Sequence, residues 1–241
     1  MSGKSFFIDL SKCTACRGCQ IACKQWKKLP AEPTRNTGSL QNPPDLSAVT
    51  LKVVRMREEG QGDSLRLFSM PDQCRHCIDP SCKAAGDRIV KDAITQDKDT
   101  GAVIFTEKTK RLPIKDIRAA CPYDIPRVDE KTKLMHKCDM CNDRVQGGLL
   151  PACVKTCPTG AMHFGDRDEM LKLGQERLEK LKATRPKAVL VDYEQVRAVF
   201  LTEDDPRLYA KNLMADAAGP KLYTRLAALE MFLGPLRQSR V

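Results

Sequence analysis

The chain has 241 residues, of which 41% are hydrophobic, 30% are charged and only 5% are aromatic. This is the composition of a folded globular protein, and the length allows one large domain or two small ones. The formal net charge of +10 favours an anionic partner such as nucleic acid. If twelve thiolates held three oxidised [4Fe-4S] clusters, however, the charge would fall to about +4 and that argument would lose most of its force.

The first half of the chain predicts short strands separated by turns and cysteine-rich loops. Residues 26–50 contain four prolines and are expected to form a loop. We expect strands at residues 6–8, 51–56, 65–68 and 102–105, where apolar side chains lie between polar turns.

The last third of the chain contains no cysteine and predicts ordinary helices and strands. An apolar stripe predicts an amphipathic helix at residues 166–182, and a second one is expected at 222–233. Residues 188–191 and 196–201 predict strands. No stretch approaches the roughly 20 apolar residues that a membrane helix needs. The N-terminus shows no signal-peptide pattern, so we expect neither a membrane span nor a leader in this chain.

Twelve cysteines dominate the first two thirds of the sequence. They are Cys13, Cys16, Cys19, Cys23, Cys74, Cys77, Cys82, Cys121, Cys138, Cys141, Cys153 and Cys157. Many are only three or four positions apart, and such close neighbours rarely reach disulfide geometry. Metal ligation is therefore a better explanation than a disulfide framework.

The run Cys13-x2-Cys16-x2-Cys19-x3-Cys23 has the spacing of two-cluster ferredoxins. In that arrangement the first three thiolates bind one cubane and the fourth binds the other. A structural zinc site is the alternative, but it needs only four ligands, usually in two separated pairs. The residue after the fourth cysteine is Lys24 rather than the usual proline.

A second run, Cys138-x2-Cys141-x11-Cys153-x3-Cys157, ends in Pro158 and has the same pattern with one longer spacer. Exchange of the fourth cysteine between the two runs predicts two ligand sets. Group A is Cys13, Cys16, Cys19 and Cys157, and group B is Cys23, Cys138, Cys141 and Cys153.

The middle of the chain supplies a third set. Cys74-x2-Cys77-x4-Cys82 is followed 39 residues later by Cys121-Pro122, which has the position of a fourth cysteine. Group C is therefore Cys74, Cys77, Cys82 and Cys121, and it predicts a third [4Fe-4S] cluster.

In a two-cluster module, group C would be paired with a second cluster. The positions for the ligands of that cluster contain no cysteine. These four positions, at the same spacing, are Gly86, Arg111, Ile114 and Ile117. We expect one cluster to have been lost there, with the two isoleucines filling its volume near Gly86 and Arg111 at the surface or paired with a carboxylate. The alternative is that Ile114 and Ile117 are one face of an ordinary helix.

Several charged or titratable residues adjoin the cysteines. Lys24, Lys137 and Lys155 each stand beside one, and a cation near a cluster stabilises the reduced state and raises the reduction potential. The alternative for each is a plain solvated lysine. We expect His76 to be a neighbour of group C rather than a ligand or proton relay.

Three segments carry a resemblance to a known family. They are Thr37-Gly38-Ser39 to Asn42-Pro43-Pro44-Asp45-Leu46, Cys138-Asp139-Met140-Cys141-Asn142-Asp143-Arg144, and Pro151-Ala152-Cys153-Val154-Lys155-Thr156-Cys157-Pro158. With the cysteine pattern, they resemble the four-cluster iron–sulfur subunit of molybdenum or tungsten bis-pterin oxidoreductases, in its formate dehydrogenase branch and with one cluster missing. The form without a membrane anchor is similar to the beta subunit of soluble periplasmic formate dehydrogenases.

This resemblance implies a function. The chain would relay single electrons through three [4Fe-4S] clusters between a tungsten- or molybdenum-pterin catalytic subunit, with which it forms a heterodimer, and an acceptor such as a multihaem cytochrome c. It would carry no catalytic site itself, would not bind nucleic acid and would have no membrane span. It would be periplasmic, exported folded with a catalytic subunit that carries the signal.

The fold class expected is α+β, with two ferredoxin-like modules in pseudo-twofold relation. Residues 1–30 and 130–165 would form the module with two clusters, and residues 50–125 the inserted module with one. Residues 166–241 would be an extension packed on the core or on the partner. Two alternatives stay open: the same relay serving a different bis-pterin reductase, and a zinc-binding nucleic-acid module.

Overall fold

The computed structural model describes residues 3–35 and 38–215. Its strands are β1 (Lys4–Asp9), β2 (Val53–Glu59), β3 (Arg66–Asp72), β4 (Ile94–Gln96), β5 (Val103–Phe105), β6 (Arg127–Val128), β7 (Met135–His136), β8 (Met162–Asp166), β9 (Val189–Val191) and β10 (Ala198–Thr202). Its helices are α1 (Gly18–Trp26), α2 (Ser81–Asp87), α3 (Ile114–Ala119), α4 (Asn142–Gln146), α5 (Ala152–Lys155) and α6 (Arg167–Lys182). The expected α+β class is confirmed, while the helix expected at 222–233 lies outside the described residues.

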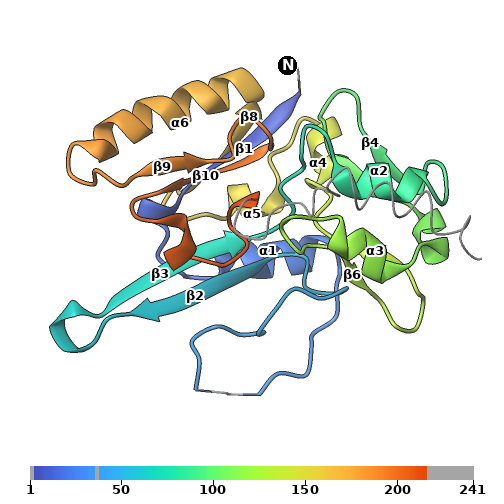
Figure 1. Cartoon of the computed structure of the whole chain (residues 1–241), viewed down its shortest axis with the longest axis horizontal. Helices are drawn as coiled ribbons and strands as arrows, with labels where there is room; N and C mark the ends of the chain where they lie inside the picture. Colours follow the sequence, from blue (N-terminus) through green and yellow to red (C-terminus); the bar gives the residue numbers. More distant parts are fainter. Residues whose placement is uncertain (1–2, 36–37, 216–241) are drawn as a thin grey trace, which may run out of the picture.

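A four-stranded sheet in the order β8-β1-β10-β9 lies beneath α6 (Figure 1). β1 pairs in parallel with β10 and antiparallel with β8, so the first strand lies between two strands from late in the sequence. The strands expected at 6–8, 188–191 and 196–201 are all confirmed. The part of the predicted extension that the structure describes thus shares a sheet with the N-terminus.

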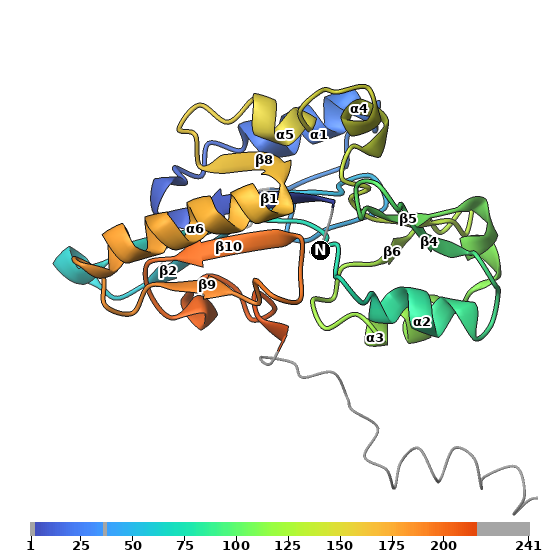
Figure 2. The same cartoon turned by 90° about the horizontal axis from the view of Figure 1, so that it is seen from above.

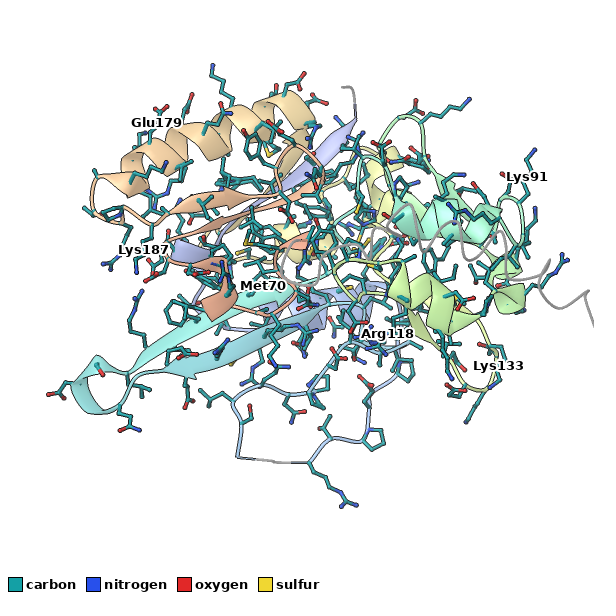
Figure 3. All side chains as sticks on the ribbon, viewed as in Figure 1. Met70, Lys91, Arg118, Lys133, Glu179 and Lys187 are labelled. Carbon is teal, nitrogen blue, oxygen red and sulfur yellow. The ribbon has the colours of Figure 1, made fainter. Side chains whose placement is uncertain are left out.

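Successive side chains of β1 face opposite sides of this sheet. Phe7 points toward α6, which covers one face and approaches closely at Gly174, where an added Cβ would lie 3.4 Å from the Phe7 ring. Phe6 and Ile8 face the other side and pack in one core with the hairpin β2–β3, including Met70. Figure 3 shows Met70 in the interior and charged residues such as Glu179 at the periphery.

A smaller apolar core lies to one side of the sheet. Figure 2 shows α2, α3, β4 and β5 gathered there, away from α6. Ile117 is fully buried in this core and Ile114 packs against it. Gly86 belongs to the same neighbourhood, because a Cβ added there would lie 3.2 Å from Ile94 of this core. Arg111 is exposed, as expected. Ile114 and Ile117 both lie on α3, which agrees with the alternative of one helix face, and their replacement of a lost cluster stays a prediction.

No helix within residues 3–35 and 38–215 is long and apolar enough to span a bilayer. The segment 27–35 and 38–52 is irregular, as the prolines predict, and Asn42-Pro43 is a cis peptide. The strands expected at 51–56, 65–68 and 102–105 are confirmed with shifted ends.

Truncation of the buried isoleucine should destabilise the protein markedly. Ile117→Ala removes a side chain with 0% exposure, and such a cavity costs about 2–5 kcal/mol. For a chain of this length that lowers the thermal midpoint by roughly 4–20 °C, measured by circular dichroism on anaerobic protein. Ile89 is 49% exposed, so Ile89→Ala is the matched control. A midpoint for Ile117→Ala no lower than the control's would contradict the buried core.

Candidate metal centre

Three Cys-x2-Cys loops share one backbone conformation. The residue just before the second cysteine has a positive φ in each of them: Ala15 (56°), His76 (47°) and Met140 (65°). A non-glycine residue in this region costs about 1–3 kcal/mol. In two of the loops the strained residue's N–H donates to the Sγ of the first cysteine, at 3.4 Å for both His76 and Met140. Such turns present backbone N–H groups toward an anionic centre.

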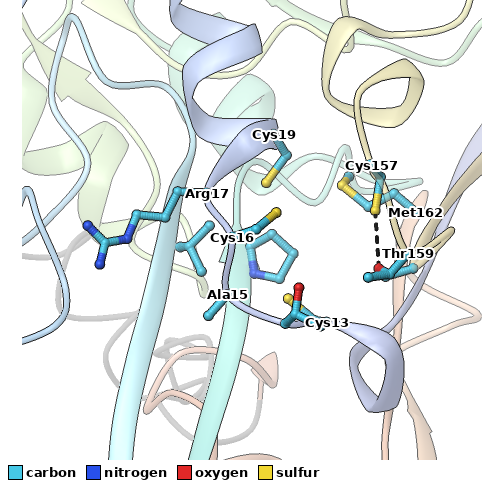
Figure 4. Close-up of a pocket in the computed structure, with 12 residues that line it drawn as sticks. Cys13, Ala15, Cys16, Arg17, Cys19, Cys157, Thr159 and Met162 are labelled. Carbon is cyan, nitrogen blue, oxygen red and sulfur yellow. Dashed lines mark hydrogen bonds between the residues drawn. The ribbon is translucent and has the colours of Figure 1, made fainter.

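The four cysteines of group A line one hollow. Figure 4 shows Cys13, Cys16 and Cys19 on the loop before α1 and at its start, facing Cys157 from the loop after α5. Cys16 is exposed, while Cys13 and Cys157 are partly exposed. The Thr159 hydroxyl lies 3.7 Å from the Cys157 Sγ. Burial would raise the pKa of Cys157, but the hydrogen bonds from Thr159 and from backbone N–H groups outweigh it and lower the pKa.

Group B is buried throughout. Its members Cys23, Cys138, Cys141 and Cys153 are all buried. Burial raises the pKa of Cys23 to about 12, with further contributions from Cys153 and Cys141. Cys19 and Cys23 lie one turn apart on α1, and α5 packs against that helix. Each of these helices therefore contributes to both groups. Helix α1 carries Cys19 of group A and Cys23 of group B. Helix α5 carries Cys153 of group B, and the loop after it carries Cys157 of group A.

Group C is assembled from the loop after β3, the first turn of α2 and the end of α3. Burial raises the pKa of Cys77, and the thiolates of Cys74, Cys121 and Cys82 raise it further. Burial likewise raises the pKa of Cys82 to about 12. Cys121, although 39 residues from Cys82 in sequence, lies beside the other three.

The chemistry of these groups fits iron–sulfur ligation. All twelve cysteines are free of disulfides, and each group offers four thiols, the number that a [4Fe-4S] cluster binds. Buried thiols with raised pKa values stay protonated without a cation, whereas a bound metal holds them as thiolates. Within the described residues, no three or more His, Cys, Asp or Glu side chains converge on the position of a single metal ion.

The three lysines singled out by the sequence differ in their surroundings. Lys137 is buried, donates to the carbonyls of Val103 and Cys138, and lies 4.9 Å from the Phe105 ring. The Lys24 ammonium donates to the carbonyls of Pro30 and Val49, both at 2.7 Å. Lys155 is exposed, so water screens it.

His76 is fully buried and holds its loop in place. Its Nδ1 accepts a hydrogen bond of 3.0 Å from the Val103 N–H, while its Nε2 has no partner among the described residues. Burial lowers its pKa well below the usual value, and Lys137 and Arg197 lower it further, so the ring is neutral. This agrees with a neighbour of group C rather than a ligand.

Sequence reasoning missed one charged residue among the cysteines. Lys52 is 2% exposed, and its ammonium donates to the carbonyl of Pro71, which lines the hollow of group A. Burial alone would lower its pKa, but the thiolates of Cys153, Cys19 and Cys138 reverse this and raise it. No local signal marks its burial, because a single lysine in a short apolar stretch such as Leu51 to Val54 is ordinarily expected to face water.

Comparison with known proteins gives the family. A profile described as a 4Fe-4S dicluster domain matches residues 65–167. The formate dehydrogenase 2 subunit beta (cytochrome c-553) of Nitratidesulfovibrio vulgaris is 51% identical over 210 residues, which cover 86% of this chain and 96% of that one. The chain belongs to the formate dehydrogenase beta-subunit family.

Other similar proteins are also iron–sulfur or beta subunits of formate dehydrogenases. The formate dehydrogenase subunit beta of Megalodesulfovibrio gigas is 51% identical over 213 residues, covering 88% of this chain and 99% of that one. The nitrate-inducible formate dehydrogenase iron–sulfur subunit of Escherichia coli is 42% identical over 179 residues, covering 73% and 58%. This beta subunit therefore transfers electrons through [4Fe-4S] clusters in an oxidoreductase complex and is not the catalytic subunit. The identity of individual ligands stays a prediction.

Proposed function

We propose that this beta subunit relays single electrons through three [4Fe-4S] clusters, between a catalytic subunit that interconverts formate and CO2 and an external acceptor. The observation that supports it most directly is that Cys13, Cys16 and Cys19 line one hollow together with Cys157, which comes from far along the chain. Each cluster supplies one-electron redox chemistry. The chain's own residues hold the thiolates, limit access of water and set the local charge.

The groups are proposed to form a line with B in the middle. Group B is buried throughout, whereas A and C both contain partly or fully exposed cysteines. A and B share the helices α1 and α5. Lys137 links B to C, because it donates to the carbonyl of Cys138 and acts on the thiol of Cys82. Electrons would enter at one exposed end and leave at the other.

The two-module organisation belongs to the same proposal. Residues 1–30 and 130–165 would hold A and B, and residues 50–125 would hold C in a second ferredoxin-like module related by a pseudo-twofold axis. The apolar core around Ile117 is proposed to fill the position of a lost fourth cluster. In support of this, all four positions that lack a cysteine belong to one ligand set.

The proposed partners are a tungsten- or molybdenum-pterin catalytic subunit, in a heterodimer, and a multihaem cytochrome c as acceptor. The name of the N. vulgaris relative mentions cytochrome c-553, which supports a c-type cytochrome as acceptor and does not bear on the number of haems. We also propose a periplasmic location with export alongside the catalytic subunit, on the resemblance alone. Co-purification with metal analysis of the large subunit tests the proposed partner, and a large subunit without tungsten or molybdenum would contradict it. Fractionation of cells tests the periplasmic location.

Iron analysis tests the number of clusters. Three full cubanes imply about 12 Fe and 12 sulfide per chain in anaerobically prepared protein. The brown colour should bleach with dithionite. A reproducible content near 16 Fe would contradict the lost cluster, and one near 8 Fe would mean that one group holds no cubane.

A further inference from the structure

Lys52 is a buried cation without a carboxylate partner in the part of the chain that the structure describes. Its side chain is 2% exposed. Its Nζ donates to the Gln73 Oε1 and, at 3.4 Å, to the carbonyl of Pro71. Both acceptors are neutral, and an ammonium in the protein interior is costly unless negative charge compensates it. The surroundings must therefore supply negative charge from another source.

The buried carboxylate of Asp72 stands between Pro71 and Gln73, but it is already paired with Arg55 and Arg75. Among the described residues near Lys52, the cysteine groups are the remaining source of negative charge. The ammonium acts on Cys19 of group A and on Cys23 and Cys153 of group B. Pro71, whose carbonyl accepts from Lys52, lines the hollow of group A. The N–H of Val54, two residues on, donates at 2.9 Å to Gln20 of α1, which stands between Cys19 and Cys23. The ammonium therefore lies beside the part of α1 that carries one cysteine of each group. Lys52, Cys19, Cys23 and Cys153 are all buried, so water does little to screen the ammonium from these sulfurs.

We propose that Lys52 is a fixed cation held between the cluster sites of groups A and B, where it raises the reduction potentials of both, and that Gln73 is its positioning residue. The inference rests on the proposed ligand sets. A neighbouring positive charge stabilises the more negative, reduced state of a cluster. Because Lys52 adjoins both sites, it raises both potentials together. The difference between them, which drives transfer from one cluster to the other, is therefore largely unchanged.

Gln73 is suited to hold the ammonium. Its side chain is fully buried, and its Oε1 accepts from Lys52. Its Nε2 has no hydrogen-bond partner among the described residues. The Gln73 amide precedes Cys74, so the residue that fixes the cation also belongs to the loop that carries group C.

The test is an EPR-monitored redox titration of the purified complex. Lys52→Met keeps the length and apolar stem of the side chain and removes its charge. At a fixed potential, two of the three cluster components should become at least tenfold less reduced, a shift of at least 59 mV for a one-electron couple. The third component should shift less. Lys52→Arg keeps the charge and should restore both components to within threefold of the wild type.

Two further variants separate charge from structure. Gln73→Glu keeps Lys52 but cancels its charge, and should shift the same two components in the same direction. Lys12 is exposed although it adjoins Cys13, so Lys12→Met is the matched control and should change no component by more than threefold. If Lys52→Met loses iron, the redox titration of Gln73→Glu alone tests the role of Lys52.

The outcomes distinguish this inference from the proposed function. Unchanged potentials in Lys52→Met or Gln73→Glu, with about 12 Fe retained, would overturn the role of Lys52 and leave the three-cluster relay intact. An iron content in the wild type that does not match three cubanes would overturn the relay itself. A shift confined to one component would show that Lys52 does not lie between two clusters.

Discussion

Cys23→Ser should change the cluster held by Cys138, Cys141 and Cys153, and leave the one held by Cys13 and Cys16 largely intact. The reason is the exchange of the fourth cysteine between two runs. Cys23 is four residues from Cys19, yet its thiol lies with Cys153 and Cys141. Loss of the cubane would lower the iron content from about 12 to about 8 per chain, and EPR spectra of the reduced protein would lack one component.

Two companion variants make this result specific. Cys141→Ser should alter the same EPR component as Cys23→Ser, because both belong to group B. Cys16→Ser should alter a different one, because the exposed Cys16 belongs to group A. If Cys23→Ser and Cys16→Ser alter the same component, the exchange of ligands does not occur in this chain.

Asp72→Ala should be among the most destabilising single substitutions outside the cysteines. Asp72 is fully buried and accepts hydrogen bonds from Arg55 at 2.6 Å and from Arg75 at 2.8 Å. Arg75 is itself 1% exposed, with its guanidinium over the rings of Tyr123 and Phe200. Removing one partner of a buried pair costs about 3–5 kcal/mol, because the other charge stays buried and uncompensated.

That cost corresponds to a fall in the thermal midpoint of roughly 6–20 °C for a chain of this size. Asp166 provides the matched control, since it pairs with Lys4 at 2.8 Å but is 62% exposed. Exposed pairs contribute about 0–1 kcal/mol, so Asp166→Ala should lower the midpoint by less than about 4 °C. Equal midpoints for the two variants would show that the Asp72 pairs do not stabilise the interior.

The cysteine groups could be predicted from the sequence because their spacing is local. Three of the four ligands of groups A and C stand within nine residues of one another, and their positions follow from the turn that joins them. The fourth ligand is distant, but the repeated pattern supplies it, as Cys121 illustrates. Cluster ligands can therefore be predicted from the spacing of cysteines in the sequence.

Strand β8 and the burial of Lys52 are harder to predict from the sequence. β8 (Met162–Asp166) was not expected, because its sequence includes His163, Gly165 and Asp166, and it becomes a strand by pairing with β1. Lys52 precedes β2, where sequence reasoning would turn a lysine toward water; in the structure it is buried and donates to Pro71 and Gln73, at the end of β3 and just beyond it. Long-range pairing and burial of this kind are not visible in local pattern.

The place of β1 between β8 and β10 also affects how the chain folds while it is being synthesised. β1 leaves the ribosome first, but its partners begin only at Met162 and Ala198. At about 5–20 residues per second, the strand waits roughly 10–40 s for both neighbours. During that interval Phe6, Phe7 and Ile8, which are buried in the finished sheet, are exposed on the nascent chain. This strand is therefore the segment that a chaperone with a preference for apolar, extended peptides would bind.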